Sequence, residues 1–239
     1  MIKLFEQFKN EQEIHDICKK YNIENYTINP DGSIDVNGDV RLTYMGFDKL
    51  PLKFNRVNGN FMCARNRLTS LEGSPKYVDG FFDCANNQLE NLECSPKEVC
   101  DGFYCQYNKL TSLKGCSEFI GGGFYCQTNN LSTLEGISLK LGSTLSCHSN
   151  NITTLKGFPV YIKGNLFLGH NPISIVDTSI EVIDGRIHIE NTEFSDIIKR
   201  LDNDRKVILF EHGADYDIFY KDGSINNSRL ERMFKDFNI

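Results

Sequence analysis

One spacing recurs without interruption through most of this chain. Every 21st residue from Leu42 to Ile189 is a cysteine, a leucine or an isoleucine. These positions, called anchors below, are Leu42, Cys63, Cys84, Cys105, Cys126, Cys147, Leu168 and Ile189. A strict repeat of this length is the signature of a solenoid, in which stacked coils bury one continuous core. The spacing therefore predicts a β-rich solenoid of about eight coils.

Apolar residues at other offsets keep the same register. The residues six and two positions before each anchor are apolar, and so are those five and eight positions after it. Within one coil, Val78, Phe82 and Cys84 alternate with Asp79 and Asp83. A period of two over a short stretch predicts a strand with one face turned inward.

The residues from Cys84 to Leu92 carry a specific pattern. They read Cys-Ala-Asn-Asn-Gln-Leu-Glu-Asn-Leu, which matches the L-x-x-N-x-L-x-x-L core of a leucine-rich repeat with Cys in first place. Because the pattern recurs in register, the chain resembles the leucine-rich-repeat family over residues 36–197. The resemblance implies one parallel sheet and extended return segments. The chain departs from the family in one respect: its upstream apolar residue stands six positions before the anchor, not five.

An asparagine stands three residues after most anchors. The set is Asn66, Asn87, Asn108, Asn129, Asn150 and Asn171. In the family that the chain resembles, this asparagine points inward and its amide bonds backbone groups of adjacent coils. A buried amide must find partners, and the turn after each strand leaves backbone groups free. Met45 and Thr192 take this offset in the first and last coils, so the ladder should weaken at its ends.

Cysteine use follows the same register. Five of the nine cysteines are anchors, where they exchange with leucine and isoleucine. They are therefore predicted to pack as small hydrophobes, reduced and buried, rather than to form a redox or metal array. The other four, Cys18, Cys94, Cys100 and Cys116, lie off the ladder and are expected to be partly exposed.

A solenoid needs caps over its terminal coils, and the sequence offers one at each end. Residues 1–35 are predicted to form a helix and a hairpin. Asn10 and Glu13 have the spacing of a capping box, and Pro30-Asp31-Gly32 lies between two alternating stretches. The solenoid itself should span residues 36–197.

Residues 198–239 are predicted to form a mainly helical C-terminal cap or a small module. Ile197 to Leu201 suggests a short helix, and Ser228 with Glu231 has the spacing of a capping box for a last helix. Between them, Tyr216, Ile218 and Tyr220 alternate as a strand would. The apolar run from Val207 to Phe210 precedes Gly213, which favours a helix end there.

Charge and hydropathy exclude several classes of partner. The net charge is −6 with both signs interspersed, and no block of Lys and Arg favours a nucleic-acid or anionic membrane partner. No apolar run approaches the ~20 residues of a membrane-spanning helix. The first residues lack the uninterrupted apolar stretch of a signal peptide. We therefore expect a cytoplasmic protein.

Residues that flank the anchors should face outward and form stripes, because neighbouring coils stack ~4.8 Å apart. The candidate partner-binding residues are Met62, Phe81, Tyr104, Tyr107, Tyr125, His148, Phe167 and His170. Aromatic residues suit strand surfaces in general, yet a contiguous exposed patch is a common mark of a protein interface. The sequence thus favours a non-enzymatic protein-binding module that uses no cofactor and no metal. It resembles short Cys/Asn-rich leucine-rich-repeat proteins of bacteriophages and bacteria, which implies a cytoplasmic role such as binding a host factor.

Two other functions stay open at this stage. The same face could sequester a nucleotide or another small ligand, although its scarcity of Lys and Arg argues against this. Glu211, His212 and Asp215 cluster in the tail and could serve an enzymatic C-terminal module; solvated loop residues are the simpler interpretation. His148 and His170 are expected to be exposed, as interface residues or plain surface rather than as metal ligands.

Overall fold

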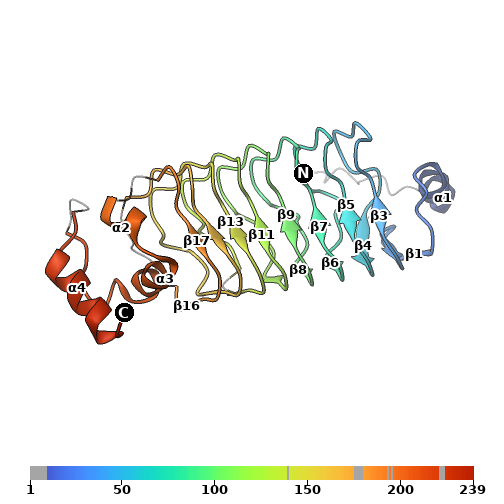
Figure 1. Ribbon diagram of the computed structural model, residues 1–239. Helices are drawn as coiled ribbons and strands as arrows, with labels where there is room; N and C mark the ends of the chain where they lie inside the picture. Colours follow the sequence, from blue (N-terminus) through green and yellow to red (C-terminus); the bar gives the residue numbers. More distant parts are fainter. Residues whose placement is uncertain (1–9, 139, 175–179, 193, 195, 221–223) are drawn as a thin grey trace, which may run out of the picture.

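The computed structural model describes residues 10–138, 140–174, 180–192, 194, 196–220 and 224–239. Figure 1 shows coils stacked along one axis, with a helix at the N-terminal end and three helices at the C-terminal end. The helices are α1 (Glu11–Lys20), α2 (Asp196–Arg200), α3 (Asn203–His212) and α4 (Asn227–Asp236). The predicted solenoid is confirmed.

The strands form two sheets, not the one sheet that the resemblance implied. Sheet A contains β1 (Tyr26–Ile28), β2 (Ile34–Val36), β4 (Phe54–Val57), β6 (Tyr77–Val78), β8 (Glu98–Val99), β10 (Phe119–Ile120), β12 (Lys140–Leu141), β14 (Tyr161–Ile162) and β16 (Val182–Ile183), in that order. Sheet B contains β3 (Val40–Arg41), β5 (Phe61–Met62), β7 (Phe82–Asp83), β9 (Phe103–Tyr104), β11 (Phe124–Tyr125), β13 (Leu145–Ser146), β15 (Leu166–Phe167) and β17 (Ile187–His188). The residue six before each anchor ends a strand of sheet A, which explains the departure from the family spacing.

A sharp bend joins the two strands of each coil. In register, Phe61 pairs with Phe82 and Phe82 with Phe103 along sheet B, so successive coils differ by one 21-residue step. Glycines occupy most of the bends because the backbones of adjacent coils nearly touch there. A Cβ added at Gly185 would lie 2.4 Å from the backbone of Gly164. Such contacts leave no room for a side chain at the bend.

The core consists of ladders of identical offset. All five cysteine anchors are fully buried, as predicted, and their thiols are free. Beside them the rings of Phe61, Phe82, Phe103 and Phe124 pack in sequence, with centroids 5.6, 5.1 and 5.4 Å apart. Cys94 and Cys100 are exposed as expected, whereas Cys18 is buried. Cys18 lies on the apolar face of α1, where packing against the first coils excludes water.

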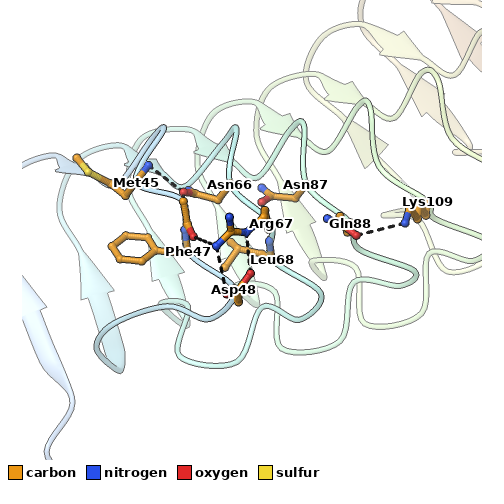
Figure 2. Close-up of polar contacts among 10 residues, drawn as sticks. Met45, Phe47, Asp48, Asn66, Arg67, Leu68, Asn87, Gln88 and Lys109 are labelled. Carbon is orange, nitrogen blue, oxygen red and sulfur yellow. Dashed lines mark hydrogen bonds and ion pairs between the residues drawn. The ribbon is translucent and has the colours of Figure 1, made fainter.

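The inward asparagine ladder is confirmed and joins each coil to the one before it. The Nδ2 of Asn108 donates to the carbonyl oxygens of Cys84 and Cys105, at 3.1 Å each. Its Oδ1 accepts from the N–H of Leu89 at 3.0 Å. Equivalent bonds recur along the ladder, and Figure 2 shows Asn66 accepting from the backbone N–H of Met45 in the first coil.

The N-terminal cap forms as predicted. Asn10 and Glu13 make a reciprocal capping box at the start of α1. The β1–β2 hairpin is antiparallel, and β2 then pairs with β4, so the hairpin extends sheet A beyond the first coil. The turn between its strands contains Asp31, which accepts bonds from Ser33 and Lys53. These bonds hold the pKa of the Asp31 carboxyl well below its usual range.

The C-terminal cap closes both sheets with side chains from α3. The Oδ1 of Asn203 accepts from the N–H of Ile187 in the last strand of sheet B, at 3.1 Å. A carboxylate oxygen of Glu211 accepts from the N–H of Ile183 in the last strand of sheet A, at 2.7 Å. Backbone groups that would pair with a further coil therefore find partners here, which blunts the sheet edges.

Two details of the tail differ from the sequence prediction. The capping residue of α4 is Asn226, which accepts from the N–H of Arg229, so Ser228 lies inside the helix instead of before it. Tyr216, Ile218 and Tyr220 do not form a strand; among the described residues of this stretch only an isolated bridge joins Phe219 to Ile225. The helix end predicted at Gly213 is confirmed, and so is the short helix predicted around Ile197 to Leu201, which spans Asp196–Arg200.

The cysteine ladder should resist thiol reagents in the native protein. Burial raises the pKa of Cys105 and Cys126 well above the usual thiol value, and the thiolate is the reactive form. We expect a maleimide to modify the exposed Cys94 and Cys100 within minutes and the anchors only after denaturation. Mass spectrometry of digested protein checks this. Rapid native labelling of Cys84, Cys105 or Cys126 would contradict the buried ladder.

Replacing one ladder asparagine should destabilise the whole stack. Asn108→Ala removes four side-chain hydrogen bonds and leaves the Leu89 N–H without a partner, so we expect a loss of roughly 1–3 kcal/mol in unfolding free energy. Asn86 is exposed with φ 54°, where glycine fits but alanine is strained, so Asn86→Gly is the matched control. Urea denaturation gives both values. Equal midpoints for the two variants would disprove the assigned register.

Candidate protein-binding surface

The outward surface of sheet B, called the strand face below, is built from residues at odd offsets from the anchors. Residues three before, one before and one after an anchor point away from the core, because alternate side chains of a strand lie on opposite faces. Their inward neighbours, such as Phe103 and Cys105, are fully buried. The core thus fixes which residues the strand face displays.

Three aromatic residues lie side by side at the centre of the strand face. Tyr104 and Tyr125 stack with ring centroids 4.7 Å apart and planes 3° from parallel. Phe81 meets Tyr104 edge-on, at a centroid distance of 5.8 Å. Phe81, Tyr104 and Tyr125 are called the aromatic row below. The structure therefore brings together three of the residues that the sequence singled out.

Two glycines set the orientation of the tyrosine rings. A Cβ added at Gly102 would lie 2.8 Å from the ring of Tyr104, and one at Gly123 would lie 2.9 Å from the ring of Tyr125. Each ring therefore lies against the backbone of its own strand, two residues upstream. The sequence Gly-Phe-Tyr-Cys-Gln occurs at 102–106 and again at 123–127, so both coils build the same arrangement. The repeat of this five-residue sequence is the signal from which the role of Gly102 and Gly123 beneath the tyrosine rings could have been found.

The remaining outward aromatic residues are separated from this row. Phe167 stacks on His188 with centroids 4.3 Å apart, forming a second pair towards the C-terminal end. Ser146, which is buried, occupies the same offset in the coil between Tyr125 and Phe167. Met62 lies towards the N-terminal end of the aromatic row, beyond Asp83. Its sulfur accepts a hydrogen bond from the guanidinium group of Arg41. The predicted site residues thus form two aromatic groups instead of one continuous stripe.

The residues two after each anchor share an unusual backbone conformation. They are Tyr44, Arg65, Asn86, Tyr107, Thr128, Ser149, His170 and Asn191, and their φ angles lie between 54° and 61°. This left-handed region is disfavoured for residues with a Cβ. Tyr107 and His170, both predicted site residues, are exposed here at the rim of the strand face. Sequence reasoning missed this conformation because only Asn86 and Asn191 are typical of it.

The residues one after each anchor change character along the face. Ala64 and Ala85 are buried instead of exposed, because short side chains are covered by their neighbours. Gln106 and Gln127 follow them and are half-buried. The Oε1 atom of each glutamine is closed off from solvent and accepts no hydrogen bond from the residues that the structure describes. Neither glutamine was among the predicted site residues.

His148 continues this row and is half-buried instead of exposed. Burial, and to a lesser degree the neighbouring His170, lowers the pKa of its imidazole. Its Nδ1 lies 3.0 Å from the hydroxyl of Ser149, while Nε2 of His170 lies 3.1 Å from the amide nitrogen of Asn191. Among the described residues no group of three or more His, Cys, Asp and Glu side chains could hold a metal ion.

Charge on the strand face is concentrated at its ends. The stretches 81–86, 102–107, 123–128 and 144–149 contain one carboxylate, Asp83, and no Lys or Arg. Burial raises the pKa of Asp83, against the opposing effects of the Ala85 N–H and Arg65. At the N-terminal end, Arg41 pairs with Asp39 at 2.8 Å and Arg65 lies over the ring of Tyr44 at 4.9 Å. The central face therefore combines aromatic and neutral polar side chains with a single carboxylate.

The three residues of the tail cluster, Glu211, His212 and Asp215, have different surroundings. Glu211 caps sheet A, and burial raises the pKa of its carboxyl. His212 stacks on Phe237 with centroids 4.6 Å apart, and its Nε2 lies 3.9 Å from Glu211. Asp215 is exposed. A cavity of about 480 Å³ lies elsewhere in the tail, lined in part by Ile197, Leu230 and Phe234.

Comparison with known proteins identifies the fold. The chain is similar to a solved structure described as a Shigella effector LRR domain, with a TM-score of 0.55 and 19% sequence identity over 78% of each chain. The fold is leucine-rich-repeat-like. No family model and no curated protein matches the sequence. Among the described residues, no helix is long and apolar enough to cross a membrane.

The left-handed position offers a direct test of strain in the coils. Thr128 has φ 58° and is β-branched, so this conformation is especially unfavourable for it. Thr128→Asn should therefore stabilise the protein by about 0.5–1 kcal/mol, since asparagine tolerates the left-handed region. The reverse change at the equivalent position, Asn86→Thr, should destabilise by a similar amount. Urea unfolding measures both; a Thr128→Asn variant no more stable than the parent would refute the strain.

Proposed function

We propose that this protein is a non-enzymatic module that binds a protein partner through the strand face of its solenoid. The observation that carries the proposal is the aromatic row, Phe81, Tyr104 and Tyr125, held half-exposed on a rigid parallel sheet. Tyrosines bury large areas on binding with little loss of conformational entropy, and they are enriched among energetically dominant interface residues. Solenoids of this class present extended surfaces that commonly bind proteins.

The proposed binding surface has a centre and a rim. Phe81, Tyr104 and Tyr125 form the centre of this surface. The rim comprises Met62, Tyr107, His148, Phe167 and His170. Such an arrangement matches the usual anatomy of interfaces, in which a few aromatic side chains supply most of the binding energy and the surrounding residues exclude water.

Charge and chemistry support a protein partner over the alternatives. A nucleic acid, a nucleotide or an anionic membrane would need cations, and the central coils of the strand face contain no Lys or Arg. An enzymatic tail is also disfavoured, because Glu211 serves as a cap of sheet A and Asp215 lies exposed. We therefore propose neither a catalytic role nor a cofactor, and we place the activity in the cytoplasm.

The test is to remove the two tyrosine side chains of the aromatic row and to ask whether the protein still binds its partner. A Tyr104→Ala/Tyr125→Ala variant should keep its fold, since both rings lie outside the core, and should lose ~2 kcal/mol or more of binding free energy, about 30-fold in affinity. Affinity capture from host-cell lysate, quantified by mass spectrometry, identifies the partner. Circular dichroism monitors the fold.

A matched control comes from the other sheet of the solenoid. Tyr77→Ala/Tyr161→Ala removes two half-buried tyrosines from sheet A and should leave capture unchanged. Loss of capture in this control together with full capture by the folded Tyr104→Ala/Tyr125→Ala variant would move the site to sheet A. Full capture by both variants would move it to the rim or the tail.

A further inference from the structure

Two glutamine side chains on the strand face hold acceptors that the free protein does not use. Gln106 and Gln127 occupy the same offset in successive coils, each two residues after a tyrosine of the aromatic row. The Oε1 of each is buried, and no donor bonds it among the residues that the structure describes. Buried polar atoms are nearly always paired in native proteins. Two equivalent exceptions side by side therefore call for an explanation.

The surroundings of these acceptors indicate which donor would suit them. Neighbouring coils lie ~4.8 Å apart, so the side chains of the two glutamines start from backbone positions at about that spacing. Tyr104 and Tyr125 lie on the same face with their rings stacked. In the preceding coil, Asp83 pairs in register with Tyr104 and so occupies the same position. No Lys or Arg lies in the central stretches 81–86, 102–107, 123–128 and 144–149. The centre of the face thus offers oxygen acceptors, one carboxylate and π surface, but no cation.

We propose that the centre of the strand face binds an arginine side chain of the protein partner, with Gln106 and Gln127 as its hydrogen-bond acceptors and Tyr104 and Tyr125 as its aromatic neighbours. The proposal rests on the proposed function and names the chemistry of its partner. A guanidinium group carries five N–H donors in one plane and stacks on aromatic rings. It therefore meets the amide oxygens and the tyrosines at the same time.

Binding through these oxygens requires the amides to turn, because both Oε1 atoms are buried in the free protein. The terminal torsion of glutamine is broad, so rotation can bring Oε1 from its closed position to the surface. Rotation breaks no hydrogen bond of Oε1, because that atom makes none. Changes of side-chain rotamer at interfaces are common on binding. A lysine ammonium would satisfy the charge but lacks the planar group that spans two acceptors and stacks.

The first experiment uses the guanidinium group itself as the probe. The full-length protein, labelled with ¹⁵N, is titrated with N-acetyl-arginine amide and, separately, with N-acetyl-lysine amide up to 100 mM. We expect the side-chain amide signals of Gln106 and Gln127 to shift with arginine at least three times as far as with lysine. Equal shifts with the two probes, or no shift with arginine, would overturn the proposal.

Two sets of variants locate the effect. Gln106→Leu/Gln127→Leu removes the acceptors and should abolish the response of the Tyr104 and Tyr125 signals to arginine. The same change should raise the urea midpoint, because it removes two buried unpaired atoms. Gln88→Leu is the control: this glutamine is exposed, bonds Lys109 at 3.3 Å and should leave the response unchanged. Figure 2 shows Gln88 and Lys109 at the side of the coils.

A gain-of-binding variant guards against misfolding as the cause of any loss. Gln106→Glu/Gln127→Glu keeps the size of the side chains and provides charged acceptors, so arginine should bind about tenfold more tightly. Unchanged affinity in this folded variant would count against the glutamines as the site.

Partner capture separates this inference from the proposed function. If Tyr104→Ala/Tyr125→Ala abolishes capture while Gln106→Leu/Gln127→Leu retains it in full, the strand face binds a protein but not through arginine. If neither variant alters capture, the centre of the strand face does not bind the partner, and both this inference and the aromatic row as the binding site fail. If both variants lose capture while the Gln88→Leu control retains it, the result supports both the proposed function and the arginine site.

Discussion

Each inward asparagine amide joins two coils, and the rest of the structure depends on this contact. Asn129 donates to the carbonyl oxygens of Cys105 and Cys126 and accepts from the N–H of Leu110, so one side chain closes three backbone groups at the end of two strands. The strands are two residues long in most coils and could not hold the register by themselves. Repetition of the amide contact, together with stacked cysteine and phenylalanine ladders, makes the solenoid a rigid frame.

The proposed function rests on the side chains that this frame holds on its outer face. The core fixes Phe103 and Cys105 inward, and the residues between and beside them, Tyr104 and Gln106, then point to the other face of the sheet, where both are half-buried. The close fit at Gly102 and Gly123 lets the tyrosine rings lie on the backbone, where they stack on one another. The proposed binding surface is therefore preorganised, and the proposed partner would need to order few of its residues on docking.

The C-terminal cap satisfies backbone groups at the end of the stack. An interrupted solenoid exposes backbone N–H groups in its last strands. Asn203 and Glu211 accept two of these, from Ile187 and Ile183, and the helices of the tail pack behind them. Glu211 therefore has a structural explanation for its burial and for the raised pKa of its carboxyl. Of the acidic and histidine cluster noted in the sequence, Glu211 is thus the member that caps a sheet.

The sequence by itself determined the period, the inward ladders, the N-terminal capping box and the helical tail, because each depends on local spacing that every coil repeats. Several features only the tertiary structure decided. The two-sheet arrangement depends on the bend at glycines such as Gly185, where coils touch. The position of Asn226 as a cap and the burial of Cys18 depend on packing of the ends. The stacking of Tyr104 on Tyr125 and the unpaired oxygens of Gln106 and Gln127 arise between coils, 21 residues apart in the chain. Local patterns specify a coil, whereas the surface that a partner would meet is a property of neighbouring coils and is set by their contact.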